Sequence, residues 1–350
     1  MYQLIPYIFY VPVFYEKDDI FNINTALSHE HFSDNYSINE FTMRKKLVVG
    51  ISLPTLRESR WIRDKETMEN YAKEKGINVK IQNADTDEVK QASQVDNMIS
   101  QGIDTLILAP VNSETASSII QKAHDAGIKV IIYERFVKNG NEDLFVSFNS
   151  TVVGELQGRY LTRHVPRGNY IIMSGDPKDR NSKFYKDGAM EFIQPLADKG
   201  DIKIITDKAV ENWDPKNAYK IVQDALIANN NKIDAILAPN DAVAGAAIDA
   251  LKTKGLAGKV VVTGQDADLA AVRRIIQGTQ AMTVFKDTRQ LSKVAIESAI
   301  NLANKKPTEI NGLAVDMSSI LLTPIIVDKF NLSKVLVGSG YYTPAELFKP

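Results

Sequence analysis

The chain has 350 residues, more than one ordinary open α/β domain needs and enough for two. Its formal net charge is −1, so no overall field attracts nucleic acid or an anionic membrane surface. It contains no cysteine, which excludes disulfides, zinc–thiolate sites, cysteine nucleophiles and thiol redox switches. Its histidines lack metal-ligand spacing and no catalytic or phosphate-loop motif occurs, so we predict no metal, no cofactor and no enzymatic activity.

The first 44 residues differ in composition from the rest of the chain. Tyr2–Tyr15 is apolar and aromatic, but it carries prolines and is too short to span a bilayer as a helix. No basic cluster precedes this stretch and no small-residue cleavage site clearly follows it, so it is a poor signal peptide, and residues 1–43 lack a helix-turn-helix pattern. A truncated or misassigned export signal is slightly favoured over a tether or a docking strand for a partner. We predict an N-terminal extension over residues 1–44, outside the main fold, and no binding of nucleic acid.

From Lys45 onward, short apolar runs alternate with helical stretches. The runs have the length and the apolar content typical of buried parallel strands. The stretches between them place apolar residues three and four positions apart, as at Val95, Met98 and Ile99. Strands and helices joined in this order predict parallel sheets covered by helices on both faces. The predicted strands are Leu47–Leu53, Val79–Ile81, Thr105–Ala109, Val130–Tyr133, Tyr170–Met173, Ile202–Ile205, Ala235–Ala238 and Val260–Thr263.

Two segments of the chain repeat one order of features. Residues 103–134 and 233–266 each contain Ile-Asp, Leu-Ala-Pro, a helix, a glycine and a second apolar strand. This shared order exceeds what periodicity requires, so we predict an α/β fold of two similar doubly wound parallel-sheet lobes. The predicted boundaries are 45–147 with 288–317 for the N-terminal lobe, 148–285 with 324–350 for the C-terminal lobe and tail, and a hinge of three crossings near 147–148, 286–287 and 318–323.

Polar and aromatic side chains collect directly after the predicted strands, where open parallel sheets bind their ligands. Solvated loops would be richer in Gly, Ser, Lys and Glu, and both tryptophans of the chain belong to this set. The residues that follow the strands are Arg60, Trp61, Asn112, Glu134, Arg135, Asp176, Asp179, Arg180, Asn181, Asn212, Trp213, Asn240, Asp241, Gln265, Asp266, Lys286 and Asp287.

This set of side chains suits a sugar. Flat indoles cover the C–H faces of a sugar ring, and Asp, Asn, Arg and Lys exchange hydrogen bonds with its hydroxyls. Buried polar partners also discriminate between epimers, because the wrong epimer leaves one of them unpaired. The charges balance, which favours a neutral ligand: three cations face three carboxylates, namely Arg60, Arg135 and Lys286 against Glu134, Asp241 and Asp266.

From about Lys45 to Val327 the chain resembles the periplasmic pentose-binding proteins that feed sugar ABC transporters, specifically their D-xylose-binding members. The resemblance covers about four-fifths of the chain, and its later motifs are long and specific. The stretches that carry it are Arg60–Trp61, Ile99–Pro110, Gly154–Gln157, Gly168–Tyr170, Trp213 with Pro215 and Asn217–Ala218, Ala228–Ala235, Asn240–Ala242, Gly264–Leu269, Gly278–Gln280 with Met282–Val284, and Leu321–Pro324.

The resemblance implies an extracytoplasmic receptor of the type I binding-protein fold, in which two lobes close on D-xylose or a close pentose and deliver it to a permease. It places the ring-stacking pair on Trp61 and Trp213. The acid before the cleft arginine is usually Asp in that family and is Glu134 here, where it joins the predicted site. The remaining hydroxyl partners implied are Arg60, Arg135, Asn181, Asn240, Asp266 and Lys286.

Two pairs of nearby polar residues, Asn240 with Asp241 and Asp266 with Asp268, each precede a predicted helix. Either member of a pair could cap the helix, so each residue needs its own assignment. We assign Asn240 and Asp266 to the ligand. We assign Asp241 and Asp268 to the helix N-termini.

Three other functions remain open at this stage. A receptor could dock on a membrane sensor histidine kinase and signal the sugar instead of transporting it. A sugar-responsive transcription regulator shares the fold, but residues 1–43 lack its DNA-binding domain. A sugar-modifying enzyme would need a nucleophile, metal or cofactor motif that the sequence does not show.

Overall fold

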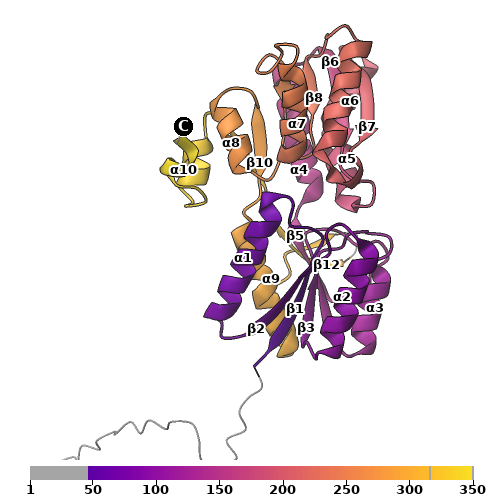
Figure 1. Ribbon diagram of the computed structural model, residues 1–350, viewed down its shortest axis with the longest axis vertical. Helices are drawn as coiled ribbons and strands as arrows, with labels where there is room; N and C mark the ends of the chain where they lie inside the picture. Colours follow the sequence, from indigo (N-terminus) through magenta and orange to yellow (C-terminus); the bar gives the residue numbers. More distant parts are fainter. Residues whose placement is uncertain (1–45, 315–316, 349–350) are drawn as a thin grey trace, which may run out of the picture. The chain divides into compact units, whose positions relative to one another are not determined.

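The computed structural model describes residues 46–314 and 317–348 (Figure 1). The predicted extension over residues 1–44 lies outside the described residues. From Lys45 onward the chain forms one compact unit. It contains two larger, mainly parallel sheets with helices on both faces of each, and a two-stranded antiparallel sheet (Figure 1). The predicted α/β fold with two parallel-sheet lobes is therefore confirmed.

The first sheet has seven strands in the order β11-β12-β5-β4-β3-β1-β2, all parallel to their neighbours except β11. Helices α1 and α9 pack on one face and α2 and α3 on the other (Figure 1). The strands are β1 (Val48–Leu53), β2 (Asn78–Asn83), β3 (Thr105–Leu108), β4 (Lys129–Tyr133), β5 (Leu144–Phe148), β11 (Gly312–Ala314) and β12 (Met317–Leu322). The helices are α1 (Ser59–Glu74), α2 (Glu88–Ser100), α3 (Ser117–Asp125) and α9 (Thr288–Ala303).

The second lobe is built around the parallel sheet β7-β6-β8-β9, which a bridge between Gln265 and Val284 extends towards the antiparallel pair β10-β13. The strands are β6 (Gly168–Ser174), β7 (Ile202–Ala209), β8 (Ala235–Leu237), β9 (Val261–Val262), β10 (Met282–Phe285) and β13 (Ile325–Asp328). The helices are α4 (Ser150–His164), α5 (Arg180–Asp198), α6 (Pro215–Ala228), α7 (Asp241–Lys252), α8 (Leu269–Ile276) and α10 (Pro344–Phe348), with short helical turns at Glu211–Trp213 and Ser333–Val337.

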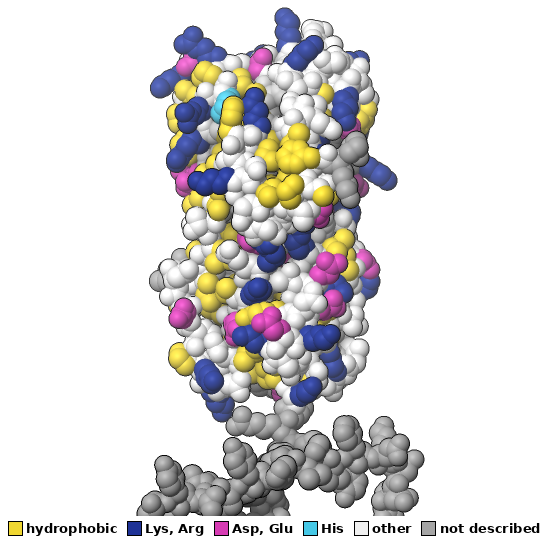
Figure 2. Space-filling model, turned by 90° about the vertical axis from the view of Figure 1, so that its left-hand side faces the viewer, with side chains coloured by type: hydrophobic (Ala, Val, Ile, Leu, Met, Phe, Trp, Pro, Cys, Tyr) yellow, Lys and Arg dark blue, Asp and Glu magenta, His cyan; other side chains and the backbone are white. Residues whose placement is uncertain are grey.

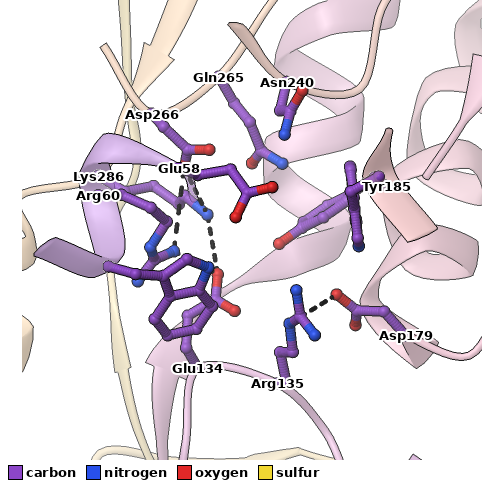
Figure 3. A pocket seen from close by; sticks show the side chains of 12 residues that line it. Glu58, Arg60, Glu134, Arg135, Asp179, Tyr185, Asn240, Gln265, Asp266 and Lys286 are labelled. Carbon is purple, nitrogen blue, oxygen red and sulfur yellow. Dashed lines mark hydrogen bonds and ion pairs between the residues drawn. The ribbon is translucent and has the colours of Figure 1, made fainter. Parts of the chain in front are cut away.

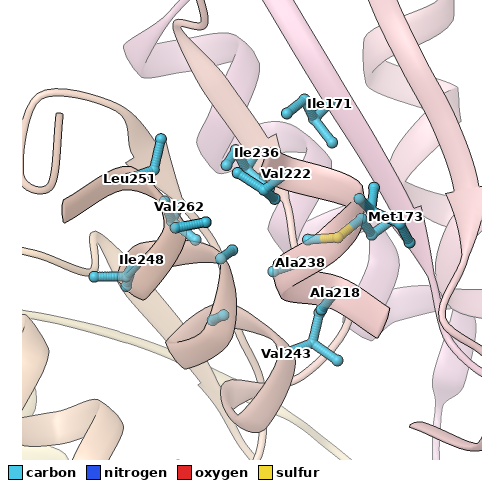
Figure 4. Close-up of a cluster of buried hydrophobic side chains, with 14 of the residues drawn as sticks. Ile171, Met173, Ala218, Val222, Ile236, Ala238, Val243, Ile248, Leu251 and Val262 are labelled. Atoms are coloured by element: carbon cyan, nitrogen blue, oxygen red, sulfur yellow. The ribbon is translucent and has the colours of Figure 1, made fainter. Parts of the chain in front are cut away.

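Each lobe has its own apolar core, because every central strand buries both faces. In the second lobe, Ile171 and Met173 of β6 and Ile236 of β8 meet Val222 of α6 and Ile248 of α7 (Figure 4). The surface above these cores mixes charges of both signs, and Figure 2 shows cationic and anionic side chains interspersed on one face. No helix within residues 46–314 and 317–348 is long and apolar enough to cross a bilayer.

The chain passes between the two sheets after β5, after β10 and after β12. Residues 318–322, which the sequence places in the third crossing, lie in β12, and Ser319–Leu322 pair with β5 of the first sheet. That crossing therefore falls at Thr323 and Pro324, between β12 and β13. The lobe boundaries as a whole stay a prediction.

Helices α4 and α5 approach closely because glycines face the partner backbone. A Cβ atom on Gly154 would lie 1.9 Å from the carbonyl oxygen of Tyr185. We expect Gly154→Ala to lower the free energy of unfolding by about 1–3 kcal/mol, since the helices must separate. Urea denaturation measures this, with the exposed Lys220→Ala as a control expected within about 0.5 kcal/mol of wild type. Equal losses for both variants would show that this contact is not tight.

Candidate functional site

A pocket lies between the two lobes, at the carboxyl ends of their strands. The space between its lining atoms, counted out to the opening and including open solvent, is about 320 Å³. Figure 3 shows its side chains converging on a central space from both lobes. The lining residues are Glu58, Arg60, Trp61, Glu134, Arg135, Asp179, Tyr185, Trp213, Asn240, Gln265, Asp266 and Lys286.

The structure brings together eight of the nine residues proposed for the ligand. Asn181 is the exception, because its side chain binds the neighbouring lobe's backbone. Its amide nitrogen donates to the Glu134 carbonyl at 2.8 Å, and its oxygen accepts from the Phe136 amide at 3.4 Å. Asn181 thus ties α5 of the second lobe to the loop after β4 of the first.

Four lining residues were not selected from the sequence. Asp179 and Gln265 were found among the residues that follow strands, but neither was assigned to the ligand. Glu58 is the N-cap position of α1, two residues ahead of Arg60 in the sequence, so its place in the chain was a usable signal. Tyr185 lines the pocket from inside α5, a position that a rule about strand ends does not find.

Buried ion pairs form the floor of the pocket. Arg60 donates to Glu134 at 2.6 Å and to Asp64 at 2.8 Å. The ammonium group of Lys286 lies 2.9 Å from Glu134 and 3.0 Å from Asp266 (Figure 3). Each of these side chains is at most 8% exposed, so the charges are removed from water and hold one another.

The ion pairs set the ionisation of the floor. Burial alone would raise the pKa of Glu134, but the cations of Arg60 and Lys286 lower it to about 2. Burial would lower the pKa of Lys286, and the carboxylates of Asp266 and Glu134 raise it well above its usual range. Glu134 and Lys286 therefore stay charged throughout the physiological pH range, which gives a ligand a fixed acceptor and a fixed donor.

The two tryptophans lie on opposite lobes and both are buried at the pocket. Trp61, on α1, is 2% exposed and lies beside the guanidinium groups of Arg60 and Arg135. Trp213, after β7, is 5% exposed and its indole N–H has no partner among the described residues. Its φ of 53° is unusual for a bulky residue, and such strain concentrates at functional sites.

The sequence of the chain matches the model of the periplasmic binding protein domain over residues 49–307. It is 42% identical over 307 residues to the D-xylose-binding periplasmic protein of Escherichia coli (strain K12), covering 87% of this chain and 93% of that protein. The chain belongs to the periplasmic binding protein family. The resemblance predicted from the sequence is thereby confirmed, and the chain is a binding protein rather than an enzyme.

Other similar proteins are named for multiple sugars or were solved with a sugar other than D-xylose. The multiple sugar-binding periplasmic receptor ChvE of Rhizobium radiobacter is 37% identical over 328 residues, 86% of this chain and 92% of that protein. A carbohydrate transporter solute binding protein of Chloroflexus aurantiacus, solved with D-glucose, is 31% identical with a TM-score of 0.83, covering 86% of this chain and 98% of that one.

The assignment of helix caps in this binding protein needs correction. Asn240, not Asp241, caps α7, because its side-chain oxygen accepts from the Val243 amide at 2.9 Å. Asp241 is instead buried and accepts from Gln280 at 2.8 Å and from Thr283 at 2.9 Å. An Asn-Asp pair before a helix offers two competent caps, and only the backbone angles decide between them.

The second correction concerns Asp268, which precedes α8 but makes no capping bond with its side chain. Its carboxylate accepts from the Ser59 hydroxyl, so it links the second lobe to the start of α1 in the first. The backbone amide of Asp268 donates to Asp241 at 2.9 Å. Asp268 thus holds the lobes together instead of capping a helix.

Another link between the lobes joins Arg135 to Asp179 at 3.1 Å. Burial raises the pKa of the Asp179 carboxyl to about 6, although Arg135 acts in the opposite direction. The folded protein thus holds this proton more tightly than the unfolded chain, in which the Asp179 carboxyl has a pKa near 3.8. Asp179 therefore adds stability at low pH and loses that contribution as the pH rises from about 4 to about 6.

We expect this pH dependence to disappear in Asp179→Asn, whose amide oxygen can still accept from the Asn181 amide. The free energy of unfolding of wild type minus that of the variant should fall by up to roughly 3 kcal/mol between about pH 4 and 7. Urea denaturation across that range gives the difference. Parallel pH curves for the two proteins would contradict the assigned titration.

No group of three or more His, Cys, Asp or Glu within the described ranges has the geometry of a metal site. The pocket itself offers fixed hydrogen-bonding groups and two indole rings, which bind a ligand without chemically changing it.

Proposed function

We propose that this periplasmic binding protein holds D-xylose, or a closely related pentose, between its two lobes. The observation that carries the proposal is the pocket's pairing of two indoles from opposite lobes with a floor of matched ion pairs. Indoles suit the C–H faces of a pyranose ring, and charged groups make the stronger hydrogen bonds to its hydroxyls. The relative from Escherichia coli is named for D-xylose, and so is a relative from Haemophilus influenzae that is 40% identical over 308 residues.

The charges favour a neutral ligand. Arg60, Arg135 and Lys286 line the pocket opposite Glu134, Asp179 and Asp266. Glu58 adds a fourth carboxylate, and Arg57 outside the pocket pairs with it at 2.7 Å. A sugar acid or sugar phosphate would find no unmatched cation here, whereas a neutral pentose needs none.

Titration calorimetry with pentoses and hexoses tests the ligand. We expect D-xylose to bind more tightly than D-glucose, and intrinsic tryptophan fluorescence to change with it, because the chain's only two tryptophans both line the pocket. Equal affinity for the two sugars, or no pentose binding at all, would contradict the proposal.

The proposed setting is the extracytoplasmic side of a membrane, as in the periplasmic relatives, with an ABC permease as the partner of the loaded form. A membrane sensor kinase would use the same pocket and differ only in where it docks. Co-purification from membranes in the presence of D-xylose separates the two. Recovery of a kinase without any permease would overturn the transport assignment and leave the ligand assignment intact.

A further inference from the structure

We propose that Glu58 determines sugar specificity by accepting a hydrogen bond from one hydroxyl of the bound sugar. The inference rests on the proposed sugar-binding function and names a contact beyond it. Glu58 is 9% exposed, and its carboxylate points into the open centre of the pocket (Figure 3). One oxygen, Oε1, accepts from Arg57, while Oε2 is buried without any partner among the described residues.

An unpaired carboxylate oxygen in a buried site is costly, so it needs a function. Helix capping does not supply one: Glu58 holds the N-cap position of α1, but its side chain accepts no hydrogen bond from the helix. Oε2 also lies outside the network in which Arg60 and Lys286 hold Glu134 and Asp266. A hydroxyl donor placed in the pocket would complete the hydrogen bonding of this oxygen.

Arg57 is the positioning residue for this acceptor. Its guanidinium donates to Glu58 Oε1 at 3.0 Å from Nε and 2.7 Å from Nη2. Nη2 also donates to the carbonyl oxygen of Asn212 at 2.7 Å. Asn212 belongs to the second lobe and directly precedes Trp213, so one guanidinium fixes both the acid and the loop that carries the indole. The acceptor is therefore fully held only when the lobes are together.

The ligand chemistry follows from the acceptor. A carboxylate oxygen accepts hydrogen bonds and cannot donate them, so the matching group must be a donor such as a sugar hydroxyl. A ligand in which a hydrogen atom replaces that hydroxyl loses the hydrogen bond to Glu58. A ligand with an anionic group at the same position is repelled by the carboxylate. Glu58 thereby selects a neutral aldose with one particular hydroxyl.

The test compares wild type, Glu58→Gln, Arg57→Gln and the control Glu66→Gln by calorimetry with D-xylose and each monodeoxy-xylose. Glu66 is exposed on the same α1, so it undergoes the same chemical change away from the pocket. We expect Glu58→Gln to weaken D-xylose binding about tenfold or more, Arg57→Gln to weaken it less, and Glu66→Gln to match wild type. One monodeoxy sugar, which lacks the recognised hydroxyl, should bind wild type and Glu58→Gln equally.

Near-UV circular dichroism confirms that each variant is folded. Unchanged D-xylose affinity in Glu58→Gln, or the same loss for every monodeoxy sugar, would overturn the role of Glu58 while leaving the proposed function standing. If wild type binds a hexose and no pentose, the proposed ligand fails, and the same comparison with deoxy forms of that hexose decides on Glu58. If wild type binds no sugar, both proposals fail.

Discussion

Replacing Lys286 with methionine is expected to lower the free energy of unfolding by about 3–5 kcal/mol, the usual cost of breaking a buried ion pair. The Lys286 side chain is 2% exposed and lies 2.9 Å from Glu134 and 3.0 Å from Asp266. Methionine fills a similar volume without the charge, so two carboxylates stay buried with Arg60 as their remaining partner, 2.6 Å and 3.9 Å away. Urea denaturation at pH 7 measures the loss.

Two further variants separate a lost charge from lost packing. Adding Asp266→Asn to Lys286→Met removes one uncompensated carboxylate, so the double variant should regain part of the stability. The exposed Lys220→Met should change stability by less than about 0.5 kcal/mol. The deficit of Lys286→Met should also shrink as the pH falls, because protonation neutralises the orphaned carboxylates. A deficit that does not depend on pH, with no recovery in the double variant, would show that packing is the cause.

Replacing Trp213 with alanine is expected to weaken D-xylose binding by about 2–4 kcal/mol, or roughly thirtyfold to a thousandfold. The side chain lines the pocket, packs with Val153 and Tyr185, and carries an N–H that has no partner in the part of the chain that the structure describes. Alanine removes the ring face and the free donor together. Calorimetry on Trp213→Ala measures the total effect of the substitution.

Trp213→Phe keeps an aromatic face and loses the N–H, so it should fall between wild type and Trp213→Ala. Trp61→Ala is a less specific test, because Trp61 also packs in the apolar core of the first lobe with Met68 and Leu291. We expect that variant to lose stability as well as affinity. Normal sugar binding in a folded Trp213→Ala protein would show that the ring serves the core alone.

The elements that the sequence predicted best are those whose burial is complete. The apolar runs predicted as strands at Thr105–Ala109 and Tyr170–Met173 contain or lie within central strands, β3 (Thr105–Leu108) and β6 (Gly168–Ser174). The carboxyl-end rule then found most of the pocket, because Arg135, Asn240 and Asp266 follow strands directly. At these residues the position in the sequence, directly after an apolar run, also gives the position in the fold, at the carboxyl end of a strand.

The errors occurred where several geometries suit one sequence. Asn240 and Asp241 can each cap a helix, and the structure gives that role to Asn240 and a buried network to Asp241. Tyr185 lines the pocket from inside α5, and no short-range pattern in the sequence marks that position. Asn181 follows a strand as predicted, yet its side chain binds the Glu134 carbonyl instead of lining the pocket.

Ligand-induced closure of the two lobes can be measured directly, because the chain contains no cysteine that would compete for introduced labels. Gln121→Cys on α3 and Lys216→Cys on α6 place one thiol on an exposed position of each lobe, and these are the only thiols for a donor and an acceptor dye. A ligand held by both lobes binds the closed form more tightly and shifts the population towards it. Energy transfer between the dyes should therefore rise to a plateau as D-xylose saturates the site. Unchanged transfer at a D-xylose concentration that calorimetry shows to be saturating would contradict closure.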